Sequence, residues 1–222
     1  ISYFLGFGRQ MAMGIQVQAA TVILGSQNLV AVLGIVTAVG SMISMALCPL
    51  LIKKTDEKKA YIILSVYGFA ASVFSFVIGT LWFKSPENSV LTVLFYASLF
   101  LIGLQFGAVT LMPMIMTADC VDYYEYTTGK RMEGTCYSIL TLTIKVCLAL
   151  GTAVGLIFVQ ASGYYDGLAT GSFDIKTKNI IFFAYTALPG ILALLSIIPM
   201  FKYDIVGDKK KEITKALAEK RN

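Results

Sequence analysis

The chain has 222 residues, of which 57% are hydrophobic and only 14% are charged. Soluble domains carry about 25% charged residues, so this composition excludes a soluble enzyme and a disordered tail. Histidine is absent, which removes histidine acid–base chemistry, Ser-His and Cys-His nucleophile pairs and most zinc sites. A membrane protein remains, and we expect no enzymatic activity, no catalytic residue, no cofactor and no metal site in this chain.

Charged residues divide the chain into six apolar stretches. Each is long enough to cross the bilayer as a helix, which needs about 20 residues. The apolar runs are continuous rather than alternating, which favours helices over barrel strands. The predicted transmembrane bundle, residues 1–201, has six spans, at about 1–24, 29–52, 60–83, 89–118, 134–160 and 179–201. Residues 202–222 form a charged tail in which Ile213, Ala216 and Leu217 have the spacing of a short amphipathic helix.

The lysine and arginine residues predict the orientation. Thirteen of the 18 lie in the second-to-third loop, the fourth-to-fifth loop and the tail, against three in the opposite loops. Because basic loops stay in the cytoplasm, we expect a multi-pass protein of the cell (plasma) membrane, in contact with lipid, with both ends of this segment cytoplasmic. No nucleic-acid partner is expected, since no aromatic platform accompanies the basic residues. The chain begins at Ile1 without an initiator methionine, so we expect a piece of a longer protein.

Lys145 lies near the middle of the fifth span, among apolar neighbours. An ammonium group there costs about 2.5–3.5 kcal/mol on insertion scales, so it must face a cavity or an acidic partner. All 13 acidic residues lie outside the spans, so we expect the partner carboxylate on helices outside this chain. Snorkelling to the interface is the alternative, and the distance from Glu133, roughly 18 Å along the helix, argues against it.

Two further sets of polar residues share a helix face within the spans. Thr141, Ser138 and Tyr137 lie four, seven and eight residues before Lys145 on the same face, which suits a water-filled pathway for sugar hydroxyls or, alternatively, hydrogen bonds between helices. On the first span, Arg9 and Gln16 are seven residues apart, with Gln10 and Gln18 close to the same face. We predict that these residues line the same cavity; the alternative for Arg9 is an interfacial position.

The segment between the fourth and fifth spans is dense in charges of both signs. It holds three acidic residues at intervals of three, then two basic residues and a further acid: Asp119, Asp122, Glu125, Lys130, Arg131 and Glu133. Arginine is suited to bidentate pairing with carboxylates, so this pattern indicates a salt-bridge gate at the cytoplasmic membrane face that breaks when the helices move. The alternative is a solvated charged loop.

This charged segment closely resembles a motif of the glycoside–pentoside–hexuronide:cation symporter family, of the major facilitator superfamily. The resemblance rests on Asp-x-x-Asp-Tyr-x-Glu-Tyr-x-x-Gly-Lys-Arg-x-Glu-Gly over 119–134, followed by Tyr137, Ser138 and Lys145. It covers nearly the whole chain, as the C-terminal half of a twelve-helix protein. It implies an all-α membrane fold, one six-helix bundle of two three-helix inverted repeats, whose partner is the N-terminal six-helix bundle of the same protein.

The resemblance also implies a function. Family members couple sugar or glycoside uptake to a cation, Na⁺, H⁺ or Li⁺, and Lys145 and Thr141 match positions at the sugar and cation sites. The charged segment matches the loop that closes the cytoplasmic side. The acidic cation ligands of the family belong to the N-terminal half, so no metal ligand is expected here. A non-transporting membrane sensor or scaffold, or a decayed transporter fragment, is the alternative.

Overall fold

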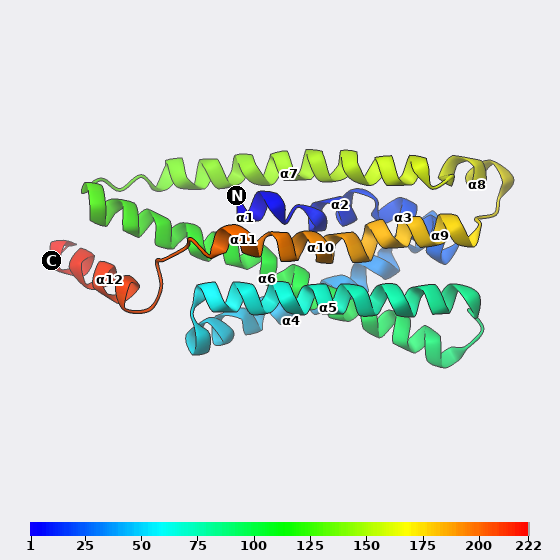
Figure 1. Ribbon diagram of the computed structural model, residues 1–222, viewed down its shortest axis with the longest axis horizontal. Coiled ribbons are helices and arrows are strands. Elements are labelled where there is room, and N and C mark those ends of the chain that lie inside the picture. Colours follow the sequence, from blue (N-terminus) through cyan, green and yellow to red (C-terminus); the bar gives the residue numbers. More distant parts are fainter. Residues whose placement is uncertain (222) are drawn as a thin grey trace.

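The computed structural model describes residues 1–221, which fold into helices and contain no strand within that range. The helices lie side by side along one long axis (Figure 1). A helix satisfies its backbone hydrogen bonds internally, which is the requirement that a bilayer imposes on a spanning segment. The predicted all-α class is confirmed.

Five helical segments of the described chain are long and apolar enough to cross a membrane. They are Gln27–Thr55, Glu57–Lys84, Ser89–Thr128, Glu133–Ala161 and Ile175–Met200. The first contains the 3-10 turn η1 (Gln27–Leu29) and α4 (Val30–Thr55), and the next three are α5 (Glu57–Lys84), α6 (Ser89–Thr128) and α7 (Glu133–Ala161). The chain is therefore built as a multi-pass membrane protein.

The first predicted span, 1–24, differs from the prediction because it is not one helix. It is divided into α1 (Ser2–Leu5), α2 (Gly8–Gly14) and α3 (Gln16–Leu24). Glycine weakens a helix by about 1 kcal/mol relative to alanine. Close packing nevertheless requires it here, because a Cβ on Gly8 would lie 2.4 Å from Pro189 Cα and one on Gly14 would lie 2.6 Å from Thr152 Oγ1. Tight contacts with neighbouring helices therefore accompany the breaks.

The last predicted span, 179–201, begins earlier and is not uniformly α-helical. After the short α8 (Tyr164–Thr170), it consists of α9 (Ile175–Phe182), the π-helical segment η2 (Phe183–Ala187), α10 (Leu188–Leu195) and α11 (Ile197–Met200). Pro189 has no N–H to bond the carbonyl of Tyr185, which weakens α-helical pairing where the π segment lies. This irregular turn positions Tyr185 beside the cavity described below.

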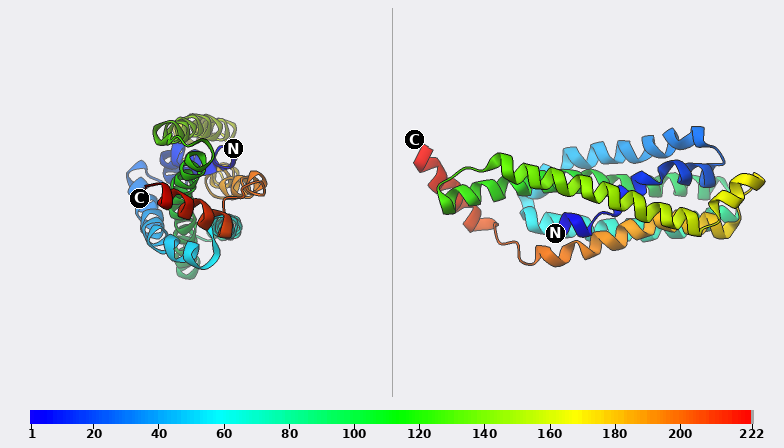
Figure 2. Two further views of the ribbon diagram at one scale, coloured as in Figure 1. Left: turned by 90° about the vertical axis from the view of Figure 1, so that its left-hand side faces the viewer. Right: turned by 90° about the horizontal axis from the view of Figure 1, so that it is seen from above.

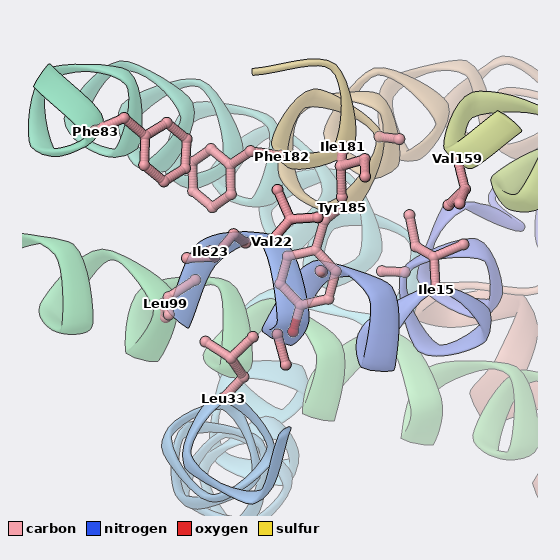
Figure 3. Close-up of a cluster of buried hydrophobic side chains, with 14 of the residues drawn as sticks. Ile15, Val22, Ile23, Leu33, Phe83, Leu99, Val159, Ile181, Phe182 and Tyr185 are labelled. Atoms are coloured by element: carbon pink, nitrogen blue, oxygen red, sulfur yellow. The ribbon is translucent and has the colours of Figure 1, made fainter. Parts of the chain in front are cut away.

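A hydrophobic core forms where α3, α5, α6 and α9 meet (Figure 3). Phe182 and Phe95 are fully buried, and the Phe182 ring centroid lies 5.8 Å from that of Phe95 and 5.3 Å from that of Phe83. A Cβ on Gly79 would lie only 2.0 Å from the Phe182 ring, so glycine is required there. Truncating a buried phenylalanine to alanine typically removes about 3–5 kcal/mol of stability.

Helices α4 and α6 approach closely along a line of glycines. A Cβ would lie 2.5 Å from the carbonyl oxygen of Phe100 at Gly40, and 2.1 Å from the carbonyl oxygen of Ser41 at Gly107. Small residues allow such backbone approach, which drives helix association in membranes by van der Waals packing. The contact fixes the part of α4 that forms one wall of the cavity.

The predicted amphipathic tail helix is present as α12 (Gly207–Arg221). Ile213 and Leu217 are buried against Tyr123, Tyr126 and Tyr203. Figures 1 and 2 show α12 at one end of the bundle, beside the end of α6. The tail therefore docks on the bundle through the apolar face that its spacing predicted.

Candidate functional site

A cavity of about 230 Å³ lies among α2, α3, α4, α6 and η2. Its lining combines apolar and small residues with a few polar groups: Arg9, Ala12, Met13, Gln16, Gly34, Thr37, Ala38, Ser41, Phe106 and Tyr185. The seven-residue spacing of Arg9 and Gln16 placed them on one face, and both line this cavity. We call it the Arg9 cavity.

Arg9 is the charged group of this cavity. Its guanidinium carbon lies 5.9 Å from the ring centroid of Phe106, within the range of a cation–π attraction. Its Nε is buried without a hydrogen-bond partner in residues 1–221, and no ion pair to Arg9 is present in that range. A guanidinium with free donors beside a cavity can bind hydroxyl or carboxylate oxygens.

The other two glutamines of this segment do not line the Arg9 cavity. The side-chain amide of Gln10, which is buried, donates a hydrogen bond to the hydroxyl of Tyr3. Gln18 is partly buried, and its Oε1 has no partner in the described chain. Of the four polar residues predicted to line one cavity, the structure therefore brings two to it.

The polar residues of α7 form a stripe on its exposed surface. Ser138, Thr141 and Lys145 are all exposed, and at 100° per residue they lie within about 60° of one another around the helix. The Thr141 hydroxyl donates to the carbonyl of Tyr137 at 2.8 Å, and the Tyr137 hydroxyl donates to the carbonyl of Met114 at 3.4 Å. Tyr137 therefore faces α6, while the other three residues form what we call the α7 polar stripe.

An apolar sector borders the α7 polar stripe. Ile139, Leu142 and Ile157 are 61%, 63% and 64% exposed. Within residues 1–221, Lys145 forms no hydrogen bond and no ion pair, and it is not part of the lining of the Arg9 cavity. The exposed surface of α7 is thus divided between a side suited to lipid and a side that carries an unpaired ammonium.

Arg131 gathers three carboxylates between the end of α6 and the start of α7. One of its terminal nitrogens, Nη1, lies 3.1 Å from Asp122 and 2.9 Å from Glu125, and its Nε lies 3.1 Å from Glu133. The hydrogen bond to Glu125, followed by that to Glu133, raises the pKa of the Arg131 guanidinium above its ordinary value. Lys130 is exposed and takes part in no ion pair within the described residues. We call Asp122, Glu125, Arg131 and Glu133 the Arg131 cluster.

Asp119 lies outside the Arg131 cluster, so four of the six charged residues predicted for the gate pair with one another. Its carboxylate lies 2.7 Å from Lys210 Nζ, which also lies 2.6 Å from Glu57 Oε1. Asp119 and Glu57 are 8% and 7% exposed, and the Tyr203 hydroxyl donates to Asp119 at 3.4 Å. We call Glu57, Asp119 and Lys210 the tail clamp, because they join α5 and α6 to α12.

The tail clamp also sets the protonation of Lys210. Burial lowers the pKa of this ammonium, but the hydrogen bonds and charges of Asp119 and Glu57 outweigh burial, so the pKa lies above its ordinary value of 10.5. Burial raises the pKa of Tyr203 as well, and the negative charge of Asp119 adds to this effect. Lys210 therefore remains a cation bound to two carboxylates at neutral pH.

Sequence reasoning missed several residues of these sites. Gly34, Ala38 and Ser41 line the cavity with a spacing of four and three residues, a small-residue face that periodicity could have identified. Tyr185 is brought to the cavity by the π segment, which has no sequence signal beyond Pro189. The pairing of Lys210 with Glu57 joins residues 153 apart in the chain and could not be foreseen.

Comparison with known proteins gives consistent matches. The family described as MFS/sugar transport protein matches residues 9–207. The inner membrane symporter YicJ of Escherichia coli (strain K12) is 31% identical over 144 residues, which are 64% of this chain and 30% of YicJ. The glucuronide carrier protein homolog of the same organism is 25% identical over 178 residues, 79% of this chain and 36% of that protein.

A Bacillus subtilis (strain 168) protein, the uncharacterized symporter YjmB, is 26% identical over 199 residues. The match covers 89% of this chain and 40% of YjmB. The chain therefore spans a little under half the length of these three relatives.

Proposed function

This chain belongs to the MFS/sugar transport protein family, and we propose that it is the C-terminal half of a secondary transporter that moves a sugar or glycoside together with a cation, Na⁺ or H⁺, by alternating access. The names of its relatives, symporters and a glucuronide carrier homolog, support a transporter of this class. The N-terminal six-helix bundle of the same protein is its proposed partner. The proposed location is the plasma membrane, with the basic end of the bundle in the cytoplasm.

The exposed, unpaired Lys145 is the observation that carries this proposal. An ammonium in the hydrocarbon region is costly unless it meets a carboxylate or water. In this proposal the α7 polar stripe faces the N-terminal bundle, which supplies the carboxylate. The apolar sector with Ile139 and Leu142 then faces lipid.

Each polar group has a role in the proposed mechanism. Lys145 is a fixed positive charge that competes with the coupling cation for the carboxylate, while the hydroxyls of Thr141 and Ser138 bind sugar oxygens. Arg9 and Gln16 supply further hydrogen-bond donors to the sugar from the Arg9 cavity. Substrate and cation would share one site between two bundles, so each shifts the same conformational equilibrium, which is the thermodynamic basis of coupling.

The Arg131 cluster has a proposed role as a cytoplasmic gate. Three carboxylates held by one guanidinium fix the connection between α6 and α7 at the end that carries most of the basic residues. Such a contact can hold one of the two access states and must rearrange when the bundles move. This arrangement supports gating by the charged segment, with Asp119 acting instead in the tail clamp.

The proposal is tested by transport in vesicles that contain the full-length protein. A labelled glucuronide, tested with a panel of other glycosides, is the first substrate, and uptake is driven by a Na⁺ or H⁺ gradient. We expect Lys145→Ala to lower gradient-driven uptake at least tenfold and Lys145→Arg to retain part of it. The control Lys84→Ala removes an exposed lysine at the end of α5 and should leave uptake at the wild-type rate. Undiminished uptake in the Lys145→Ala protein would rule out the role assigned to this residue.

A further inference from the structure

A second cleft lies at the end of the bundle, between the end of α4, the start of α5 and α12, with a volume of about 670 Å³. Five lysines line it: Lys53, Lys54, Lys210, Lys211 and Lys215. Its acidic residues are Asp56 and Glu57. We call it the basic cleft.

Both carboxylates of the basic cleft form ion pairs with lysines. Asp56 pairs with Lys59 at 3.3 Å and accepts the backbone N–H of the same residue at 2.9 Å, which caps α5. Glu57 belongs to the tail clamp with Lys210. The lining therefore holds more positive charge than its own acids neutralise.

Three of the five lysines have no acidic partner in the part of the chain that the structure describes. Lys210 is held by the tail clamp, and Lys211 pairs with Asp208 at 3.1 Å. Lys53, Lys54 and Lys215 take part in no ion pair within residues 1–221. They concentrate positive charge in a concave site, which favours an anionic ligand.

An exposed apolar stripe on α4 leads to the same cleft. Ile43, Leu47 and Leu50 are 42%, 54% and 56% exposed, and their spacing puts them on one face with Lys54. The cavity-lining residue Ala38 is five positions before Ile43, which places it about 140° away around the helix. The stripe therefore lies on a different side of α4 from the Arg9 cavity.

A positive cleft at the end of a span, continuous with an apolar stripe along that span, matches the two parts of a phospholipid. We propose that the basic cleft binds the anionic headgroup of a membrane phospholipid, with Lys53, Lys54 and Lys215 contacting the phosphate and the acyl chains lying along Ile43, Leu47 and Leu50. Basic pockets at the membrane interface bind anionic headgroups by this combination of charge and apolar contact. The basic cleft shares no lining residue with the Arg9 cavity, and a lipid bound there would join the tail to the lipid surface.

The test is a lipid titration of the full-length protein in detergent, followed by native mass spectrometry. Phosphatidylglycerol is the anionic probe, phosphatidylcholine the zwitterionic one, and inorganic phosphate the free anion. The variant K53Q/K54Q/K215Q removes the three unpaired lysines and leaves the tail clamp intact. The matched control K84Q/K176Q/K178Q removes three lysines from the opposite end of the bundle.

We expect phosphatidylglycerol to bind the wild type and the control variant equally and the K53Q/K54Q/K215Q variant at least tenfold more weakly. Raising salt from 0.1 M to 0.5 M should also weaken binding to the wild type, a measurement that does not depend on the folding of any variant. Equal binding of phosphatidylcholine, binding unaffected by salt, or an unchanged affinity in K53Q/K54Q/K215Q would overturn the proposal. Inorganic phosphate binding as tightly as the lipid would overturn the assignment to a phospholipid.

Discussion

Replacing Lys210 by methionine should release α12 from the bundle. Lys210 is the cation of the tail clamp, and its removal leaves the carboxylates of Glu57 and Asp119 close together and without their shared partner. The side chains of both acids are only 9% exposed, so water compensates them poorly. The hydrophobic cores of the bundle are untouched, so the expected effect is opening of the tail rather than unfolding of the bundle. The apolar contacts of Ile213 and Leu217 remain and limit this opening.

The magnitude follows from the burial of the three groups. Breaking a fully buried ion pair destabilises by about 3–5 kcal/mol, whereas an exposed pair contributes about 0–1 kcal/mol. The Lys210 side chain is 33% exposed, so screening reduces the larger figure, and we expect about 2 kcal/mol. Since each 1.4 kcal/mol is a factor of about ten, the open population of α12 should rise roughly 30-fold.

Hydrogen exchange measured by mass spectrometry on the full-length protein tests this expectation. Amides of residues 208–219 should exchange roughly 30-fold faster in the Lys210→Met protein, in proportion to the open population. Lys211→Met is the matched control, because Lys211 and Asp208 form a pair whose side chains are 80% and 100% exposed. Equal exchange in wild type and Lys210→Met would refute the reasoning, as would an equal acceleration in the control.

The tail clamp also predicts a pH dependence. The pKa of Lys210 in the folded protein is raised above 10.5, so its contribution is fully present below that value and is lost as the pH rises through the folded-state pKa. After correction for the intrinsic exchange rate, the part of α12 protection that depends on the charge of Lys210 should therefore fall on the alkaline side above about pH 10.5. The Lys210→Met protein should lack this alkaline transition.

Substitutions at Gly107 and Arg131 test the contact between α4 and α6 and the connection between α6 and α7. Gly107→Val should prevent folding, because even a Cβ there would lie 2.1 Å from the carbonyl oxygen of Ser41. Gly134→Ala, whose Cβ would meet no atom within 4 Å, should be tolerated, and gel filtration should show a monodisperse peak for this variant and none for Gly107→Val. Arg131→Gln should speed amide exchange in residues 129–133 several-fold, and Arg131→Lys less so because its ammonium keeps the charge but not the planar fork. Unchanged exchange in both Arg131 variants would contradict the role of the Arg131 cluster.

The middle spans could be predicted from the sequence because charge marks where apolar helices end. The predicted span 60–83 lies within α5, Glu57–Lys84, and the predicted span 134–160 lies within α7, Glu133–Ala161. A continuous apolar run must be helical in a bilayer, and charged residues at its ends are expensive to bury. These two conditions fix position and secondary structure without knowledge of tertiary contacts.

The breaks in the first and last spans could not be predicted in the same way. Composition makes 1–24 apolar, but its division depends on Gly8 and Gly14, whose packing against Pro189 and Thr152 appears only in three dimensions. The π segment around Tyr185 likewise depends on how the last span packs. Hydropathy reports that a segment is apolar and does not report where its helix is interrupted.

The candidate site was predictable where its contacts are local. Arg9 and Gln16 were placed together by helical periodicity, and Arg131 lies within nine residues of Asp122 along the chain. The tail clamp depends instead on contacts over more than 80 residues, and a lysine-rich tail offers several equivalent candidates for the pairing. Only the docking of α12 selects Lys210 among them.

The two ionic groups explain why α6 continues past the predicted membrane boundary at 118. The helix ends at Thr128, about 15 Å further on at 1.5 Å per residue, and this extension carries its acidic residues. Asp119 forms an ion pair with Lys210 of the tail. Asp122 and Glu125 form ion pairs with Arg131 of the connection between α6 and α7. The end of α6 is therefore held from two sides by separate cations. Consequently, Arg131→Gln should accelerate exchange in residues 129–133 while α12 stays protected, and equal acceleration at both places would show that the two groups act as one.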